Sequence, residues 1–227
     1  MDTIALLDRL CAANGPVTDE EMQIGGTLIP SLQSLATNGD GSWQLFVDRP
    51  EVKSWKYKRA NSSVWTFYVE AQMPFDATTL YKTQADLAFR PEWDAYCLQC
   101  RLVAEADSNE AIYWLVKFPW PLANRDYVYY RRAQCADDGT WLLVSRSAEL
   151  GCHVPVTDAV RVDEYFFAGV FAPSGPNQCT IRLVFSDNPK GSIPSSLVNW
   201  AATSAVPSFT TTLTAACQKY EQRQATK

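Results

Sequence analysis

Arg90 and Asp94 are the residues whose types and spacing most clearly suggest a functional pair. They stand four residues apart in the segment FRPEWD, residues 89–94, next to two aromatic side chains and a proline. An isolated ion inside a protein is costly, so a buried arginine here needs the carboxylate as its partner. What the pair does then depends on the residues around it. The alternative is a surface ion pair at a proline turn, which contributes little to stability.

Other reactive residue types are sparse. His153 is the only histidine, which excludes multi-histidine metal sites and leaves one candidate for a Ser–His or Cys–His pair. Cys97 and Cys100 form a CxxC without a second such motif, and residues three apart in a strand face opposite sides. We interpret them as ordinary strand residues, and we expect no metal, no cofactor and no enzymatic activity.

Composition narrows the class of protein. The 20 basic and 25 acidic residues give a net charge of −5, and no basic block is present that could bind nucleic acid. The start, MDTIALLDRLCAANG, lacks the basic and apolar regions of a signal peptide, and no segment has the roughly 20 apolar residues that span a bilayer. Seven cysteines without an export signal favour reduced thiols and a cytoplasmic location. We expect one domain, residues 1–227, acting as a monomer.

The predicted elements place helices first and strands after them. Apolar residues at helical spacing and a capping box at Thr18 and Glu21 predict N-terminal helices over about 2–37. Short segments rich in Val, Tyr, Trp and Phe then predict about nine strands, with short helices among them, over 43–187. An apolar stripe predicts a long C-terminal helix over about 192–222. The fold class is therefore α+β, with a large antiparallel sheet covered by a helix.

Four motifs occur in order and carry a resemblance to a known family. They are FRPEWD, PLANRDYVY, DNPKG and IPSSLVNWAA, within a region from about Trp43 to Tyr220. On these motifs the chain resembles the StAR-related lipid-transfer (START) domain, in particular its phosphatidylcholine transfer protein branch. The resemblance implies a helix-grip fold, in which a curved sheet of about nine strands surrounds a lipid tunnel closed by the C-terminal helix.

The resemblance also implies roles for particular residues. Arg90 would contact a lipid phosphate and Asp94 would hold the arginine. The residues that map onto the choline cage of the family are Trp114, Tyr127, Tyr165 and Phe185, the last standing where the phosphatidylcholine binder has a tyrosine. Two further positions near the ligand differ from that branch: Gln84 replaces a tyrosine, and Phe167 replaces a polar residue that reaches the acyl esters.

These implied roles are consistent with the physical chemistry of a zwitterionic lipid. An Arg–Asp pair is neutral as a unit, so a net-neutral ligand leaves no excess buried charge beside it. A quaternary ammonium donates no hydrogen bonds, and the faces of aromatic rings bind it well. Each buried methylene of an acyl chain adds about 0.8 kcal/mol, which favours a long apolar tunnel. The alternative for the four aromatic residues is ordinary core packing.

We therefore expect a soluble protein that carries one phospholipid, with phosphatidylcholine as the first candidate, and that contacts membranes transiently. The loop 119–125 could be part of a lid, with Phe118, Trp120 and Leu122 exposed to touch a membrane, or only a rigid connector. Three other functions remain open: a carrier or sensor of a sterol or another hydrophobic ligand, a lipid-gated regulatory module, and a hydrolase or cyclase that uses the same pocket.

Overall fold

The computed structural model describes residues 2–38, 42–59, 64–149, 158–191 and 206–226. Its helices are α1 (Thr3–Ala12), α2 (Asp19–Asn38), α3 (Ala77–Ala85), α4 (Arg90–Trp93) and α6 (Val206–Ala225). Its strands are β1 (Gln44–Asp48), β2 (Val52–Lys58), β3 (Trp65–Met73), β4 (Cys97–Ala106), β5 (Asn109–Val116), β6 (Arg125–Cys135), β7 (Trp141–Ser147), β8 (Val160–Val162), β9 (Tyr165–Gly175) and β10 (Gln178–Asp187).

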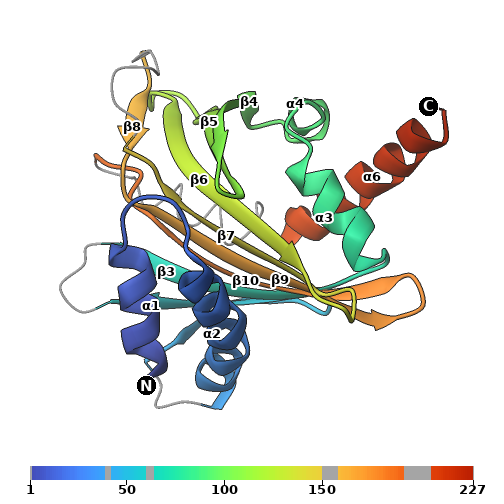
Figure 1. Ribbon diagram of the computed structural model, residues 1–227, viewed down its shortest axis with the longest axis horizontal. Helices are drawn as coiled ribbons and strands as arrows, with labels where there is room; N and C mark the ends of the chain where they lie inside the picture. The colour runs from blue at the N-terminus through green and yellow to red at the C-terminus, as the bar shows by residue number, and fades with distance from the viewer. Residues whose placement is uncertain (1, 39–41, 60–63, 150–157, 192–205, 227) are drawn as a thin grey trace.

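The strands form one curved sheet. Nine of them follow the antiparallel order β1-β2-β3-β10-β9-β7-β6-β5-β4, and β8 pairs in parallel with β6 (Figure 1). The described sheet therefore has ten strands, against about nine expected, and the shortest of them is β8. The predicted α+β class with a large, mainly antiparallel sheet is confirmed.

The two faces of the sheet are covered by different helices, as Figure 1 shows. Because successive strand residues point to opposite faces, Val184 of β10 packs with α1 and α2, whereas Leu183 and Phe185 point to the face covered by α3 and α6. The first face is filled by a continuous apolar core. The second face is where a site can form.

Helix α2 begins with the predicted capping box and is fixed to the sheet by a buried ion pair. The backbone N–H of Thr18 donates to Glu21 Oε2 at 2.9 Å, and the N–H of Glu21 donates to Thr18 Oγ1 at 3.3 Å. Arg146 of β7, whose side chain is 2% exposed, donates from Nη1 to Glu21 Oε1 at 2.8 Å. Glu21 thus caps its helix and neutralises a buried guanidinium.

We expect Glu21→Gln to lower the free energy of unfolding by about 3 kcal/mol, because Arg146 loses its counter-charge inside the protein. Burial acts to raise the pKa of Glu21, but hydrogen bonds from Arg146 and Thr18 outweigh it and hold the pKa below its usual value. The contribution of the pair is therefore present above about pH 4.3 and is lost as the pH falls through the lowered pKa. Urea denaturation as a function of pH measures both effects.

The matched control for this prediction is Glu20→Gln. Glu20 pairs with Arg9 at 2.8 Å, but both side chains are largely exposed, so its loss should change the free energy of unfolding by less than about 0.5 kcal/mol. Equal effects of the two substitutions would contradict a special role for the buried pair.

The C-terminal helix α6 packs against the face of the sheet opposite α1 and α2. Leu213 and Cys217 are fully buried there, and Ala216 and Tyr220 are nearly so. The start of the expected helix, residues 192–205, lies outside the described residues. So does His153.

Candidate functional site

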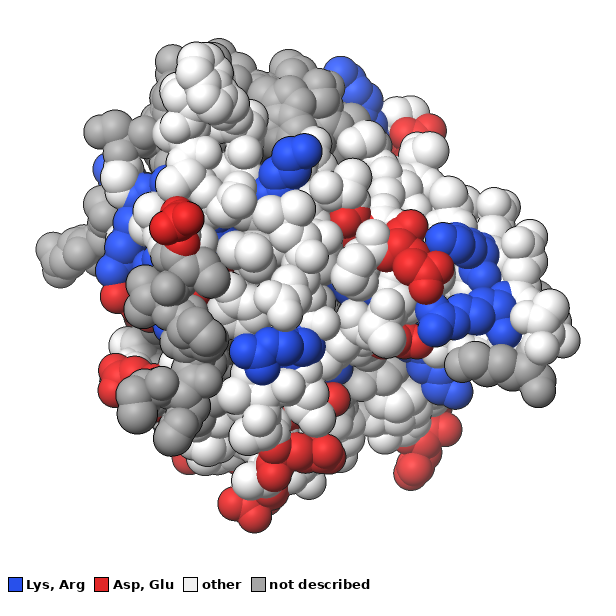
Figure 2. Space-filling model, turned by 90° about the horizontal axis from the view of Figure 1, so that it is seen from above, with Lys and Arg blue, Asp and Glu red and all other residues white. Residues whose placement is uncertain are grey.

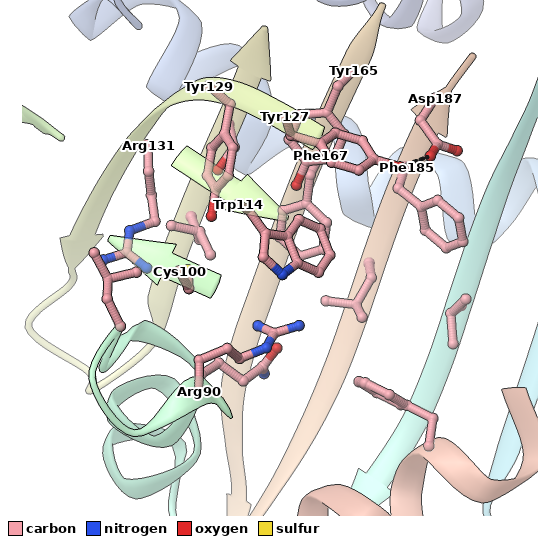
Figure 3. A pocket seen from close by; sticks show the side chains of 17 residues that line it. Arg90, Cys100, Trp114, Tyr127, Tyr129, Arg131, Tyr165, Phe167, Phe185 and Asp187 are labelled. Carbon is pink, nitrogen blue, oxygen red and sulfur yellow. Dashed lines mark hydrogen bonds between the residues drawn. The ribbon is translucent and has the colours of Figure 1, made fainter. Parts of the chain in front are cut away.

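A cavity of about 370 Å³ lies between the inner face of the sheet and helices α3, α4 and α6. This volume is within the usual range of ligand pockets. Its wall is mainly apolar and aromatic, with a few polar groups. The lining residues are Val69, Gln84, Leu87, Arg90, Cys100, Trp114, Tyr127, Tyr129, Arg131, Leu143, Ser145, Tyr165, Phe167, Leu183, Phe185, Asp187 and Phe209, several of which Figure 3 labels.

Helix α4 presents Arg90 to the cavity and Asp94 behind it. Pro91 stands in the first turn, where its fixed backbone angle suits a helix start, and Asp94 ends the single turn with its N–H on the Arg90 carbonyl. Arg90 Nε donates to Asp94 Oδ2 at 2.7 Å, with side chains 24% and 13% exposed. Burial acts to lower the pKa of Arg90, but the Asp94 carboxylate raises it above its usual value. The guanidinium therefore stays charged.

Two indole rings hold the guanidinium of Arg90. Its Cζ lies 4.7 Å from the ring centre of Trp93 and 5.2 Å from that of Trp114. Figure 3 shows the guanidinium directed into the cavity beneath the Trp114 ring. With Nε engaged by Asp94, the two terminal nitrogens face the space where a ligand would lie. Such a fork matches the oxygens of a phosphate or carboxylate.

A row of aromatic rings continues from Trp114 along the wall. Trp114 and Tyr127 are opposed in the register of β5 and β6, with ring centres 5.2 Å apart. Tyr127 meets Tyr165 edge-on at 5.5 Å, and Tyr165 lies 5.3 Å from Tyr129. Phe185, further along, stacks on Phe67 at 5.2 Å. Strand alternation places all of these rings on one face, where they can surround a cation.

The structure brings seven of the eight predicted site residues together on the cavity wall. Asp94 is the exception, since it lies behind Arg90 and orients it. Gln84 lines the cavity from α3, and its Nε2 is buried without a hydrogen-bond partner among the described residues. Phe167 lies opposite Phe185 in the register of β9 and β10.

Two charged residues on the wall were not predicted. Arg131 continues the alternation of Tyr127 and Tyr129 along β6, and its Nε donates to Glu110 Oε2 at 2.7 Å. Asp187 continues the alternation of β10 one step beyond Phe185 and accepts a hydrogen bond from the Tyr127 hydroxyl at 3.0 Å. In both cases the alternation of strand side chains between the two faces of the sheet was the signal that could have identified the residue.

Cys97 and Cys100 are strand residues, as predicted, but a bulge in β4 makes the expectation that they face opposite sides wrong. The register shifts between Cys97 and Gln99, so that Cys97 lies opposite Val116 and Cys100 opposite Trp114, on the same face. The two thiols are linked by a hydrogen bond, which raises the pKa of Cys100. Cys100 is thus part of the cavity wall. It was expected to be an ordinary strand residue.

Of the three large apolar side chains at the loop before β6, only one is exposed. Trp120 is 92% exposed, whereas Phe118 and Leu122 are half-buried. Phe118 packs under Arg125, whose Cζ is 4.5 Å from the ring centre. The expectation that all three side chains are exposed is therefore correct only for Trp120.

Comparison with known proteins identifies the family. The profile described as START domain matches residues 24–223. The chain belongs to the START domain family. The resemblance seen in the four motifs is confirmed, and with it the helix-grip class of the fold.

Individual relatives agree with this assignment. The chain is 31% identical over 199 residues to phosphatidylcholine transfer protein of Mus musculus, covering 85% of this chain and 91% of the relative. It is 28% identical to StAR-related lipid transfer protein 7, mitochondrial, of Homo sapiens, covering 74% of this chain and 47% of the relative. The crystal structure of human STARD10 superposes with a TM-score of 0.76 at 22% identity, covering 92% of this chain and 83% of that one.

The described residues were compared with the requirements of a metal site and of a membrane-spanning helix. Among the described residues, no group of three or more His, Cys, Asp or Glu could hold a metal ion, and none of the described helices has the length and apolar composition to cross a membrane. On the face seen from above, acidic and basic side chains are interspersed and much of the surface is uncharged (Figure 2).

Proposed function

We propose that this START domain binds one molecule of phosphatidylcholine in its cavity and carries it between membranes. We also propose that it catalyses no reaction. The observation that carries the proposal is the Arg90–Asp94 pair at the start of a row of aromatic rings, all facing one cavity. The arginine fork suits a phosphate, and the ring faces suit a quaternary ammonium. Similarity to phosphatidylcholine transfer protein supports the same choice.

The charge balance favours a zwitterionic ligand at the arginine. Arg90 with Asp94, and Arg131 with Glu110, are each neutral as a pair. A lipid with a net negative charge would bring an uncompensated charge into a mainly apolar space, which is costly. The apolar wall, including Phe167 where the phosphatidylcholine branch has a polar residue, is left to the acyl region.

Loading requires an opening, and the contacts between α4 and α6 are suited to release. Glu92 of α4 pairs with Lys219 and Arg223 of α6, each at 2.9 Å, and Phe89 meets Tyr220 at 5.4 Å between ring centres. Exposed ion pairs are weak and screened by salt, so they oppose the separation of α4 and α6 only slightly. The larger cost is the exposure of the buried Phe89 and Tyr220. Because α4 carries Arg90, movement of α6 also frees the phosphate site.

We propose that the protein acts in the cytoplasm and as a monomer. The six cysteines in the described part of the chain are free thiols, as a reducing compartment requires. The edge strands β1 and β4 both carry register shifts, which disfavour pairing with a second sheet edge. Membrane contact would be transient and would use the exposed Trp120.

The test is transfer of labelled lipid between vesicles. We expect catalytic amounts of protein to move phosphatidylcholine from donor to acceptor vesicles, and to move a labelled sterol no faster than the spontaneous rate. Binding without delivery would indicate a sensor or a lipid-gated module. Sterol transfer without phosphatidylcholine transfer would favour the sterol carrier, and release of free fatty acid or headgroup during the assay would reveal a hydrolase.

Trp120 provides a more specific prediction about membrane contact. We expect Trp120→Ala to slow transfer roughly tenfold, because an indole inserted at the bilayer interface contributes about 1.4 kcal/mol or more to docking. Retention of bound lipid in solution should be unchanged, since the side chain is 92% exposed and does not line the cavity. The transfer rate and the amount of copurified lipid measure the two effects separately.

Leu45→Ala is the control for Trp120. Leu45 is also a large exposed apolar residue, at 55%, but it lies in β1 at the opposite edge of the sheet. Its substitution should leave transfer unchanged. If both variants slow transfer equally, docking through the 119–125 loop is wrong.

A further inference from the structure

Asp187 is a carboxylate on the cavity wall with an unusual environment. It is the last residue of β10, opposite Tyr165 in the register with β9, and it accepts a hydrogen bond from the Tyr127 hydroxyl at 3.0 Å. Both tyrosines belong to the aromatic row. Figure 3 shows Asp187 at one end of this row and Arg90 at the other, with Trp114 and Tyr127 between them.

The groups facing Asp187 leave its charge without a cationic partner. Tyr127 from β6 and Tyr165 from β9 are the titratable groups that interact with it, and both are neutral, because burial raises their pKa values. The nearby Arg125 is engaged by the carbonyl oxygens of Pro189 and Lys190. Among the described residues, which include every arginine and every lysine except Lys227, none forms an ion pair with Asp187.

Burial raises the pKa of Asp187, and the hydrogen bond from Tyr127 only partly offsets this. A carboxyl in such a site destabilises the folded protein once it is ionised. By contrast, the two arginines on the wall have carboxylate partners, Asp94 and Glu110. Asp187 is thus the charged group of the described wall that has no ion-pair partner among the described residues. A ligand cation can supply it.

We infer that Asp187 is the counter-charge for the cationic end of the lipid headgroup and makes the cavity selective for headgroups that carry an ammonium. The inference rests on the proposed function and deepens it. The phosphate would lie at Arg90 and the ammonium beside Tyr127, Tyr165 and Asp187. A chain of contacts links the two ends: Arg90 Cζ lies 5.2 Å from the Trp114 ring centre, that centre lies 5.2 Å from the Tyr127 ring centre, and the Tyr127 hydroxyl lies 3.0 Å from Asp187 Oδ2.

The arrangement has a defined pH dependence. A bound ammonium favours the carboxylate and lowers the pKa of Asp187 from its raised value in the empty cavity. Binding then releases protons at pH values between the bound and empty pKa values. Affinity for choline lipids should therefore rise with pH and level off above the raised pKa. A lipid without a cation should show no such rise.

The most discriminating probe is a pair of lipids that differ only in charge. One is phosphatidylcholine, and the other is its isostere with an uncharged 3,3-dimethylbutyl group in place of choline, which leaves only the negative charge of the phosphate. Wild-type protein should prefer phosphatidylcholine by a large factor, and Asp187→Asn should reduce the ratio of the two affinities about tenfold or more, because an interaction with a charged group is lost. The pH dependence of phosphatidylcholine binding should also disappear.

Thermal stability distinguishes this role from a merely structural one. For an acid whose pKa is raised by folding, stability falls as the pH rises from the unfolded pKa to the folded pKa. Asp187→Asn removes that loss, so the empty variant should melt at a higher temperature than the wild type at pH 7. A variant that melts at the same or a lower temperature than the wild type would overturn the inference.

Tyr127→Phe provides a second test that is independent of the asparagine variant. It keeps the ring but removes the hydrogen bond that partly stabilises the carboxylate, so the rise of choline-lipid affinity should move to higher pH. An unchanged pH profile overturns the inference. If Asp187→Asn keeps the full preference for choline while wild-type protein binds phosphatidylcholine, only this inference fails. If wild-type protein binds neither lipid, the proposed function fails with it.

Discussion

Arg90→Ala will abolish retention of phospholipid, with an expected loss of affinity of at least about 100-fold. The substitution removes the guanidinium group that faces the cavity and leaves the Asp94 carboxylate without its partner. Breaking one side of a buried pair costs about 3–5 kcal/mol, and here the remaining charge would also repel the phosphate. The amount of phospholipid that copurifies with the variant, and its affinity in a titration with vesicles, measure the effect.

Two further variants make this result specific. Arg90→Lys keeps the charge but loses the bidentate geometry, so it should retain phospholipid at an intermediate level. Arg101→Ala is the matched control, because Arg101 stacks on Tyr113 at 5.1 Å and does not line the cavity. Full retention of phospholipid by Arg90→Ala would remove the arginine from the site.

Trp114→Ala should weaken choline lipids by roughly 30-fold and ethanolamine lipids by distinctly less. A desolvated cation–π contact contributes about 2 kcal/mol, and a quaternary ammonium has no hydrogen bonds to replace it. An ethanolamine group can still donate to the remaining acceptors around it. Competition between the two lipids for the same protein gives the ratio directly.

Trp93→Ala is the control for Trp114. Trp93 also contacts Arg90, with its ring centre 4.7 Å from Cζ, but it is absent from the cavity wall. It should therefore weaken both lipids to the same extent, through the arginine alone. If Trp114→Ala also weakens both lipids equally, the aromatic cage is not where choline binds.

The sequence predicted those parts of the site that follow from strand periodicity and from the four motifs. Alternation along β6 and β10 places Tyr127 and Phe185 on the inner face, and the resemblance indicated which of the inward residues to single out. The same alternation extends to Arg131 and Asp187. They were missed, although Asp187 is the first residue of the DNPKG motif, because strand alternation alone does not show where a cavity ends.

Other features depend on tertiary structure and carry no local signal. One extra residue in β4 turns Cys97 and Cys100 to the same face, and nothing in YCLQCRLVA marks a bulge. Large aromatic residues on an inward face also fit a solid core as well as a cavity. Only the three-dimensional arrangement shows that Trp114 borders open space while Tyr68, also in a strand, is fully buried against α1 and α2.

The central claim is that this cavity holds one whole phospholipid with its phosphate at Arg90. Native mass spectrometry of the purified full chain, followed by extraction and identification of the released lipid, tests it most directly. The account predicts a single phospholipid per chain, with a choline headgroup, and no such lipid on Arg90→Ala. A copurified sterol, or a chain that is empty and takes up no phosphatidylcholine from vesicles, would contradict it.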